Sequence, residues 1–343
     1  MRNKILIALS FGMALFSCKQ EPTISERPSG WEIKETPVEA SLRGLSAVTP
    51  DIAWASGSGG TWLRTVDGGK TWVNGVIAGL DTVDFRSIHA FDALTAIAVS
   101  AGQPAVIYKT TDGGQNWILK HTESEKAFLD GISFADEKRG YVFGDPVDGK
   151  WMILQTLNQG ESWYPVANLP EAVEGEAGFA ASGSSLLAKG SNLWLGSGGK
   201  EANLYKSADE GETWEKFSSP LVQGEATQGI FSITQIGEGE IFCVGGDYAL
   251  PDSASGNAGL FLSERKEWVK IQQSPAGYRS GVVYFSEFQW VLAVGPGGSD
   301  FSIDGGINWS SFSTEGFHSV RLGHAEASVW ASGSNGKIGR LSF

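Results

Sequence analysis

The feature that most constrains this 343-residue chain is an eight-residue motif that occurs five times. It reads Ser/Thr, any residue, Asp/Asn, any residue, Gly, two further residues and Trp. The copies occupy residues 65–72, 110–117, 156–163, 207–214 and 302–309, and an eroded copy occupies 263–268. Their closing tryptophans lie 41 to 54 residues apart. Repeats with this period predict a stack or ring of similar supersecondary units.

The motif has the chemistry of a tight turn between two strands. An Asp or Asn side chain can accept hydrogen bonds from backbone amides ahead of it, and glycine supplies the positive φ that such a turn needs. The tryptophan then starts the next strand and fills the space between neighbouring units. We therefore predict structural roles for Asp67, Trp72, Asp112, Trp117, Asn158, Trp163, Asp209, Trp214, Asp304 and Trp309.

These motifs resemble the Asp-box, or BNR, repeat of sialidases, some polysaccharide hydrolases, sortilin-type receptors and photosystem II stability/assembly factor-like proteins. All of these are β-propellers, and the resemblance implies that the motif is a peripheral turn between the third and fourth strands of a blade. It implies a fold and leaves the activity open.

Period-two alternation between glycine-rich turns predicts short antiparallel strands throughout. Seven units can be counted from their apolar opening residues, which are Leu42, Phe85, Leu129, Phe179, Phe231, Tyr278 and Phe317. The last unit lacks the motif and a fourth strand, which residues 30–34 can supply. We predict an all-β fold, a seven-bladed β-propeller of four-stranded antiparallel blades, closed by pairing of the two ends of the chain.

The first 18 residues form a bacterial export signal, in which Arg2 and Lys4 precede an apolar run from Ile5 to Phe16. The sequence Leu-Phe-Ser-Cys ending at Cys18 resembles a lipobox, which implies lipidation of that cysteine; ordinary secretion is the alternative. The predicted organisation is thus a lipoprotein signal at 1–18, a polar tether at 19–29 and a propeller at 30–343. The expected location is the periplasm or the cell surface, on a lipid anchor rather than a membrane span.

The net charge of −13 becomes −15 once the leader is removed, and such a chain repels nucleic acid. The sequence contains no phosphate-binding loop, zinc spacing or nucleophile elbow, so we expect no cofactor and no metal. The remaining cysteine, Cys243, lies in an apolar stretch and is expected to be buried and inert. We expect a monomer.

The most direct candidate for a site is the mouth of the central channel, which the first strand of each blade lines. The residues one position after the seven openers are Arg43, Arg86, Asp130, Ala180, Ser232, Arg279 and His318. The three arginines, Asp130 and His318 can form a site for an anionic or sugar ligand, because guanidinium groups match carboxylates well. The alternative is a solvated channel with charge pairs that hold the blades together.

Four longer, polar segments interrupt the repeat near residues 143–149, 174–179, 245–256 and 295–300. Insertions in repeat folds tend to share one face, often the binding face. They add the candidates Asp145, Asp148, Glu176, Asp247, Tyr248 and Asp300. Two carboxylates can carry out acid/base chemistry on a glycoside, and each can instead cap a turn or pair with an arginine.

The succession of glycine-rich segments along the mature chain looks like a bacterial branch of the photosystem assembly factor-like BNR proteins, whose members are often labelled oxidoreductases. It includes residues 144–149, 178–183, 245–248, 277–281 and 294–300. The resemblance implies a lipid-anchored module that binds a protein or glycan partner through its loop face. A glycan-acting hydrolase and an oxidoreductase are the alternatives, although the Arg-Ile/Leu-Pro motif of sialidases and a dinucleotide fingerprint are both missing.

Overall fold

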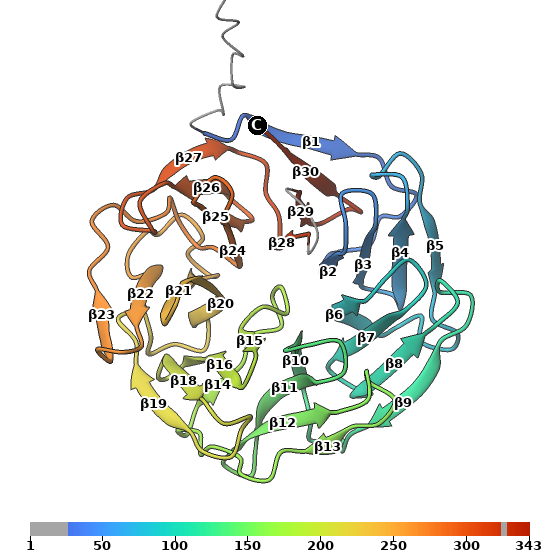
Figure 1. Cartoon of the computed structure of the whole chain (residues 1–343), viewed down its shortest axis with the longest axis horizontal. Helices are drawn as coiled ribbons and strands as arrows, with labels where there is room; N and C mark the ends of the chain where they lie inside the picture. Colours follow the sequence, from blue (N-terminus) through green and yellow to red (C-terminus); the bar gives the residue numbers. More distant parts are fainter. Residues whose placement is uncertain (1–26, 324–327) are drawn as a thin grey trace, which may run out of the picture.

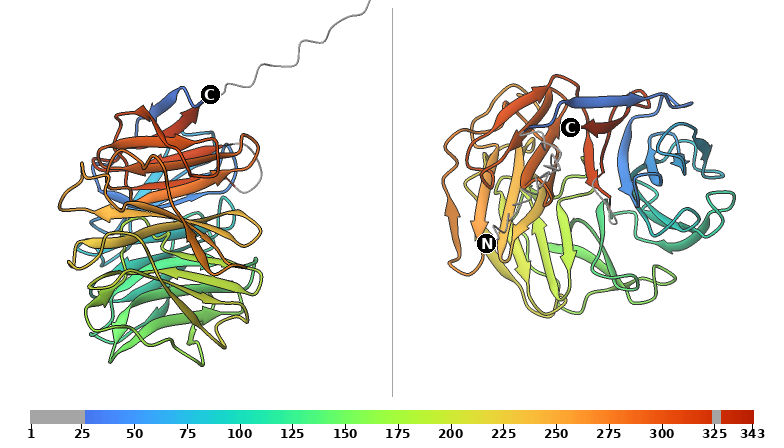
Figure 2. Two further views of the ribbon diagram at one scale, coloured as in Figure 1. Left: turned by 90° about the vertical axis from the view of Figure 1, so that its left-hand side faces the viewer. Right: turned by 45° about the horizontal axis from the view of Figure 1, so that its top comes forward.

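The computed structural model describes residues 27–323 and 328–343, and it shows seven antiparallel sheets arranged as blades around a central axis (Figure 1). The predicted all-β, seven-bladed propeller is confirmed. Seen from the side, the blades form a thick disc in which the strands of each sheet run across the thickness (Figure 2). The leader, most of the tether and the lipidation residue Cys18 lie outside the described residues.

Each of the first three blades is a four-stranded meander whose strands follow one another in the chain. Blade 1 contains β2 (Leu42–Ala47), β3 (Ala53–Gly57), β4 (Thr61–Thr65) and β5 (Val73–Val76). Blade 2 contains β6 (Asp84–Ala90), β7 (Ala96–Ala101), β8 (Val106–Thr110) and β9 (Ile118–Thr122). Blade 3 contains β10 (Leu129–Phe134), β11 (Gly140–Val147), β12 (Lys150–Thr156) and β13 (Tyr164–Pro165).

Blades 4 to 6 follow the same plan, with one irregularity between blades 4 and 5. Blade 4 contains β15 (Leu186–Lys189), β16 (Asn192–Gly196), β18 (Asn203–Ser207) and β19 (Glu215–Ser218). Blade 5 contains β20 (Gln228–Gly237), β21 (Glu240–Asp247), β22 (Ala258–Leu262) and β23 (Glu267–Val269), and two short strands, β14 (Glu176–Ala177) and β17 (Gly198–Gly199), join its inner edge. Blade 6 contains β24 (Gly281–Phe285), β25 (Trp290–Gly295), β26 (Gly298–Ser302) and β27 (Ser310–Ser313).

The last blade confirms the predicted closure of the ring. It contains β28 (Ser319–Leu322), β29 (Val329–Ser332) and β30 (Ile338–Ser342), and its outer strand is β1 (Gly30–Lys34). Strand β1 runs antiparallel to β30, with Trp31 opposite Leu341, and the two strands lie side by side at the edge of the ring (Figure 1). The ring of Trp31 packs on Phe317 at a centroid distance of 5.0 Å, and its indole nitrogen donates to Ser299 Oγ at 3.0 Å. The clasp therefore adds side-chain packing to the backbone ladder.

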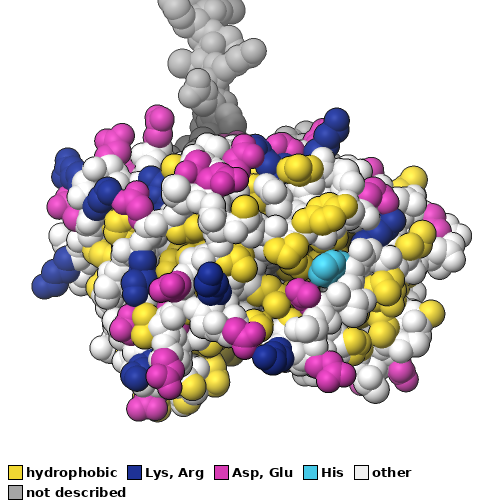
Figure 3. Space-filling model, turned by 90° about the horizontal axis from the view of Figure 1, so that it is seen from below, with side chains coloured by type: hydrophobic (Ala, Val, Ile, Leu, Met, Phe, Trp, Pro, Cys, Tyr) yellow, Lys and Arg dark blue, Asp and Glu magenta, His cyan; other side chains and the backbone are white. Residues whose placement is uncertain are grey.

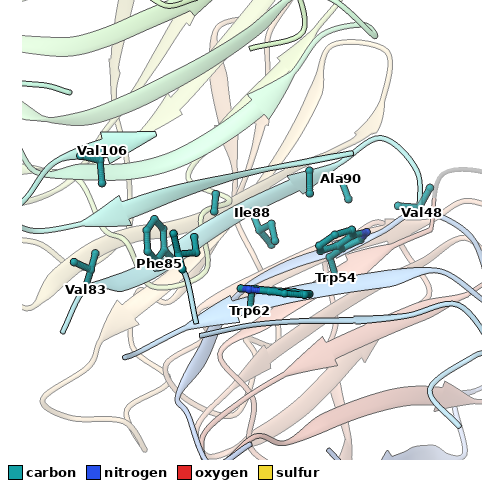
Figure 4. Packing of buried hydrophobic residues seen from close by; sticks show 11 residues of the cluster. Val48, Trp54, Trp62, Val83, Phe85, Ile88, Ala90 and Val106 are labelled. Atoms are coloured by element: carbon teal, nitrogen blue, oxygen red, sulfur yellow. The ribbon is translucent and has the colours of Figure 1, made fainter. Parts of the chain in front are cut away.

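The core lies between adjacent blades, where large apolar side chains of one sheet pack on those of the next. Between blades 1 and 2, Trp54 and Trp62 pack with Phe85 and Ile88 (Figure 4). Trp54 and Phe85 are fully buried. Because each blade buries both faces against its neighbours, the ring depends on every blade being present.

The repeated motif forms the predicted turns and joins neighbouring blades. In its first copy Thr65 Oγ1 donates to Asp67 Oδ1 at 2.9 Å and accepts the amide of Gly69, while the same carboxylate oxygen accepts the amide of Thr71 at 2.9 Å. The hydrogen bonds from Thr71 hold the pKa of Asp67 at about 2. The glycine is needed for contact as well as for φ: a Cβ on Gly114 would lie 2.3 Å from the ring of Trp62 in the preceding blade.

Candidate functional site

The residues that reach the channel mouth share one structural position, which the pairing of the first two strands of a blade defines. In blade 1, Leu42 pairs with Gly57 and Gly44 pairs with Ser56, so Arg43 is the extra residue of a β-bulge. Asp130 is the bulged residue of blade 3 in the same way, and Arg86 lies in a bulge in blade 2. A bulge redirects a side chain out of the regular alternation, here toward the channel.

In blades 5 and 6 the sequence alignment is displaced by one residue. In blade 5, Ile230 pairs with Gly245 and the bulged residue is Phe231, so Phe231 rather than Ser232 corresponds to Arg43. In blade 6 close approaches of glycine show the same displacement. A Cβ on Gly57 would meet the carbonyl oxygen of Ser41, the residue before the opener of blade 1, and a Cβ on Gly295 would lie 2.2 Å from that of Tyr278. Tyr278 thus corresponds to the residue before an opener. Arg279 therefore takes the buried place of an opener.

The side chains at this position meet in a cup of about 550 Å³ at the channel mouth. Six blades contribute one residue each at this position, and loops add further side chains. The cup is lined by Arg43, Arg86, Asp130, Phe231, Ser280 and His318, and by Phe179, Asp145, Tyr248 and Tyr278 among others. The turns of the repeated motif join third and fourth strands, so they lie at the opposite face of the disc from the first-strand starts that form the cup.

Blade 4 closes the bottom of the cup, because the residues before β15 cross the channel instead of forming a strand. Arg43 Nη1 donates to the carbonyl of Ala181 at 3.1 Å, and Arg321 Nη2 of blade 7 donates to that of Ser182 at 2.6 Å. Ser184 and Ser232 of blade 5 share a hydrogen bond between their hydroxyl groups at 2.7 Å. Figure 1 shows this loop reaching toward the axis next to β15. The cup is consequently a closed recess, not a tunnel.

One side of the cup carries positive charge. Arg86 Nε donates to Asp84 Oδ2 at 2.7 Å, whereas Arg43 forms no ion pair with any carboxylate of residues 27–323 and 328–343. Burial, and then the charge of Arg86, lower the pKa of Arg43. Burial, and then the charges of Arg43 and Arg86, lower the pKa of His318 to about 4, so this histidine is neutral at pH 7. The arginine that lacks an anionic partner gives this side a preference for an anionic group.

The adjacent part of the cup, where blade 3 follows Arg86 of blade 2, carries two carboxyl groups, Asp130 and Asp145. Asp130 is 1% exposed, and among the described residues neither of its oxygens has a hydrogen-bond partner. Asp145 accepts the amide of Gly178 at 2.8 Å. Burial, and then the nearby Asp145, raise the pKa of Asp130 well above its usual range, although the charge of Arg86 and the amide of Ala180 act in the opposite direction; burial also raises the pKa of Asp145.

Aromatic rings form the wall between these two polar sides. Phe179 stacks on Phe231 with ring centroids 3.8 Å apart, and Tyr278 meets Phe231 edge-on at 4.8 Å. Tyr248 approaches Phe231 at 6.1 Å and is 51% exposed, so its ring stands at the rim. This wall offers apolar area and a phenol group to a ligand. Sequence analysis missed the role of Phe179, Phe231 and Tyr278, because it treated the aromatic openers as blade packing.

Four of the other predicted site residues form internal contacts. Arg279 and Asp300 form a buried ion pair at 2.6 Å, and Asp300 also accepts the amide of Ala276. Glu176 is buried and accepts hydrogen bonds from Asn203 and Tyr205. Asp247, the last residue of β21, accepts the side-chain amide of Gln228 in β20 at 3.0 Å.

Asp148 is placed differently from all of these. It is exposed at a hairpin tip, where it has a positive φ of 51° and pairs with Lys126 at 3.1 Å. The structure therefore brings Arg43, Arg86, Asp130, Asp145, Tyr248 and His318 together in the cup, and it places Asp148, Glu176, Asp247, Arg279 and Asp300 outside its lining.

Another recess lies between blades 4 and 5, where the motif copy at 263–268 is eroded. It measures about 800 Å³ and lies over Trp194 and Lys206. Its charged residues alternate in sign, Lys189 and Lys206 against Glu238 and Glu264, which gives a ligand no consistent field. The outer edge seen in Figure 3 is similarly mixed, with basic and acidic side chains interspersed. The cup is therefore the better candidate, because its charges are separated.

Metal binding, membrane spanning by a helix and thiol reactivity find no support in the described residues. Between residues 27 and 323 and from 328 onward, no cluster of three or more His, Cys, Asp or Glu side chains is placed to hold a metal ion. The same ranges contain no helix long and apolar enough to cross a bilayer. Cys243 is buried in β21, and burial raises the pKa of its thiol.

Comparison with known proteins connects this architecture to one group. The family model described as photosynthesis system II assembly factor YCF48 matches residues 24–123. A protein named photosystem II assembly lipoprotein Ycf48, from Synechococcus, is 27% identical over 161 residues, which cover 46% of this chain and 46% of the relative. The chain thus matches about half the length of that relative, whose name as a lipoprotein agrees with the exported, membrane-anchored location expected from the leader.

Solved structures support the fold over nearly the whole chain. The structure of YCF48 bound to D1 peptide has a TM-score of 0.65 and 18% identity, and the match covers 91% of this chain and 97% of that one. A GH74 xyloglucanase from Xanthomonas campestris has a TM-score of 0.62 and 13% identity, over 90% of this chain and 53% of that one. At such low identity both matches establish fold alone. With the sequence match over residues 24–123, they make this chain a BNR β-propeller similar to the photosystem II assembly factors.

Proposed function

We propose that this chain is a non-enzymatic binding module whose cup takes up a segment of a partner protein, with an acidic group of that segment on Arg43 and Arg86. The observation that carries the proposal is the meeting of bulged residues from several blades in one closed recess. That recess has on one side an arginine, Arg43, that pairs with no carboxylate of the described residues, and an aromatic wall beside it. Pockets with a few placed polar groups on an apolar wall are typical binding sites.

The comparisons support a protein partner. A structural neighbour is described as bound to a D1 peptide, and the relatives are named for photosystem II assembly. We transfer from them only the class of ligand, a peptide segment of a protein, because the sequence match with the relatives covers about half of the chain. The partner of this chain is proposed to be a protein that requires assembly at a membrane.

The test uses the full-length protein and a set of acetylated, amidated pentapeptides with one tyrosine and either one glutamate or one glutamine. Calorimetry should show tighter binding of the glutamate peptides, by about tenfold, which corresponds to about 1.4 kcal/mol. Arg43→Gln should remove this preference. Arg265→Gln is the matched control, because Arg265 is exposed and pairs with Glu267 far from the cup lining. Equal binding of glutamate and glutamine peptides by the native protein would contradict the proposal.

A glycan partner is the alternative that the same protein can test. Aromatic rings and arginines also suit an acidic sugar. If a glycan array yields a ligand whose binding depends on Arg43 and no peptide binds, the partner is a glycan. The cup carries two carboxyl groups, so release of a monosaccharide from the bound glycan would indicate a hydrolase instead.

We also propose that the mature chain is held at the membrane as a monomer by a lipid on Cys18. The support is the leader and the lipobox-like sequence that ends at this cysteine. Metabolic labelling with a fatty-acid analogue should label the native protein and leave Cys18→Ser unlabelled. Release of native protein by a salt wash, without detergent, would contradict a lipid anchor.

A further inference from the structure

The cup contains a feature that binding of an anionic group does not explain, the buried carboxyl group of Asp130. The protein's other deeply buried acids are fully engaged: Asp300 accepts from Arg279, Ala276 and Ser311, and Glu176 accepts from Asn203 and Tyr205 among others. Asp130 is as deeply buried as Asp300, yet no donor among the described residues meets either of its oxygens with hydrogen-bond geometry; the amide of Ala180 is near enough to lower its pKa. An unpaired buried polar group is costly, which calls for an explanation in function.

The bulge at the start of blade 3 presents the side chain of Asp130 to the cup. The bulge that presents it is the same device that presents Arg43 in blade 1, and both side chains line the recess. Asp145 stands next to it on β11 and is less buried, with one oxygen held by the amide of Gly178. A ligand would therefore meet Asp145 first, with Asp130 behind it.

The groups that face this pair compensate its charge only in part. The amides of Gly178 and Ala180 approach from the segment before β15. The charge of Arg86 on β6 also lowers the pKa of Asp130, but Arg86 is paired with Asp84. No Lys, Arg or His side chain of residues 27–323 and 328–343 forms an ion pair with either Asp130 or Asp145. Among the described residues the two carboxyl groups thus lack a directly paired cation, which usually compensates such a pair.

Building on the proposed function, we propose that the Asp130–Asp145 pair binds a basic, hydrogen-bond-donating group of the ligand, such as a primary ammonium. The preferred ligand is then amphoteric. Its acidic group pairs with Arg43, its ring or apolar side chain rests on Phe179 and Phe231, and its ammonium group contacts Asp145 and is supported by Asp130. Charges of opposite sign at two different places in one recess fix the direction in which a segment lies as well as its affinity.

The experiment compares two peptides that both satisfy the proposed function. Each is an acetylated, amidated hexapeptide with one tyrosine and one glutamate, and they differ only in having lysine or norleucine at the remaining variable position, placed in turn on either side of the tyrosine. The native full-length protein should bind the best lysine peptide about tenfold more tightly than its norleucine counterpart, a difference of about 1.4 kcal/mol.

Variants assign that preference to the carboxyl pair. Asp145→Asn and Asp130→Asn should each bring the ratio of the two affinities close to one while leaving the norleucine peptide bound. Asp148→Asn is the matched control, because this exposed aspartate lies three residues from Asp145 and outside the cup lining, and it should keep the ratio.

The outcomes separate the two proposals. Equal affinity of the native protein for lysine and norleucine peptides overturns the inference and leaves the proposed function standing. A lysine preference that survives both Asp130→Asn and Asp145→Asn also overturns it. If neither peptide binds, the proposed function fails and the inference fails with it.

Discussion

If Asp130 is kept for ligand binding, its removal should make the protein more stable. The change is Asp130→Asn, which preserves the size of the side chain and removes the titrating proton. In the unfolded chain an aspartate ionises near pH 3.9. In the folded protein burial and the nearby Asp145 raise the pKa of Asp130 well above that value.

The sign of the effect follows from proton binding. Between the unfolded and the folded pKa, the native state holds more protons than the unfolded state, so the free energy of unfolding falls as the pH rises. This penalty grows by at most about 1.4 kcal/mol per pH unit and is absent below the unfolded pKa. The asparagine side chain of the variant does not titrate, so the variant does not carry this penalty. The gain in stability of the variant should be close to zero at pH 4 and reach at most about 4 kcal/mol at pH 7.

Urea unfolding followed by tryptophan fluorescence at pH 4, 5, 6 and 7 measures this gain directly. Asp148→Asn serves as the control, because the exposed pair of Asp148 with Lys126 contributes about 0–1 kcal/mol. The prediction concerns the difference between the two variants as a function of pH. A variant that is less stable than the native protein at pH 7, or a gain of equal size at pH 4 and pH 7, would refute the reasoning.

Two further predictions concern the frame around the cup. Trp31→Ala should lower the free energy of unfolding by about 2–4 kcal/mol, because it removes the contact with Phe317 and the hydrogen bond to Ser299. Trp31→Phe should lower it by about 1 kcal/mol. Chemical denaturation measures both losses, and equal losses would contradict the role of the ring contact. Arg279→Leu should cost about 3–5 kcal/mol by leaving Asp300 buried without its cation, and adding Asp300→Asn should restore part of that loss. A double-mutant cycle with additive losses would speak against this coupling.

The architecture could be predicted from sequence because the repeated motif determines both a turn and an interblade contact. Each copy supplies its own hydroxyl, carboxylate and glycine within a few residues, as the network at Thr65, Asp67 and Gly69 shows. Closure of the ring could be predicted as well, since a missing strand at one end matched a spare strand at the other.

The cup could be predicted only in part, since its position depends on where each bulge falls. Arg43, Arg86 and Asp130 follow their openers directly and were found. In blades 5 and 6 an aromatic residue, Phe231 or Tyr278, resembles an opener but lies one place away from the buried position, so the alignment slips by one residue. A shift of one residue turns a rim arginine into a buried one, because side chains alternate between faces.

The segment of blade 4 that closes the cup has no sequence pattern from which its path across the channel could be predicted. Residues 180–185 are alanine, serine and glycine, which fit a turn as easily as a crossing of the channel. Their contacts are with distant parts of the chain, such as Arg43 and Arg321, and local sequence does not encode them. The surroundings of Asp130 are likewise set by distant segments, since no donor of the described residues meets its oxygens with hydrogen-bond geometry.

The pairing of β1 with β30 also sets the order in which this protein can be finished. A ribosome delivers Trp31 early and its partner Leu341 only 310 residues later (341 − 31). Until then the first blade has no neighbour on one side, and the outermost strand waits unpaired, with amides open to other chains. Completion of the native ring therefore waits for β30, and a premature stop codon before Ile338 should leave an open arc prone to self-association.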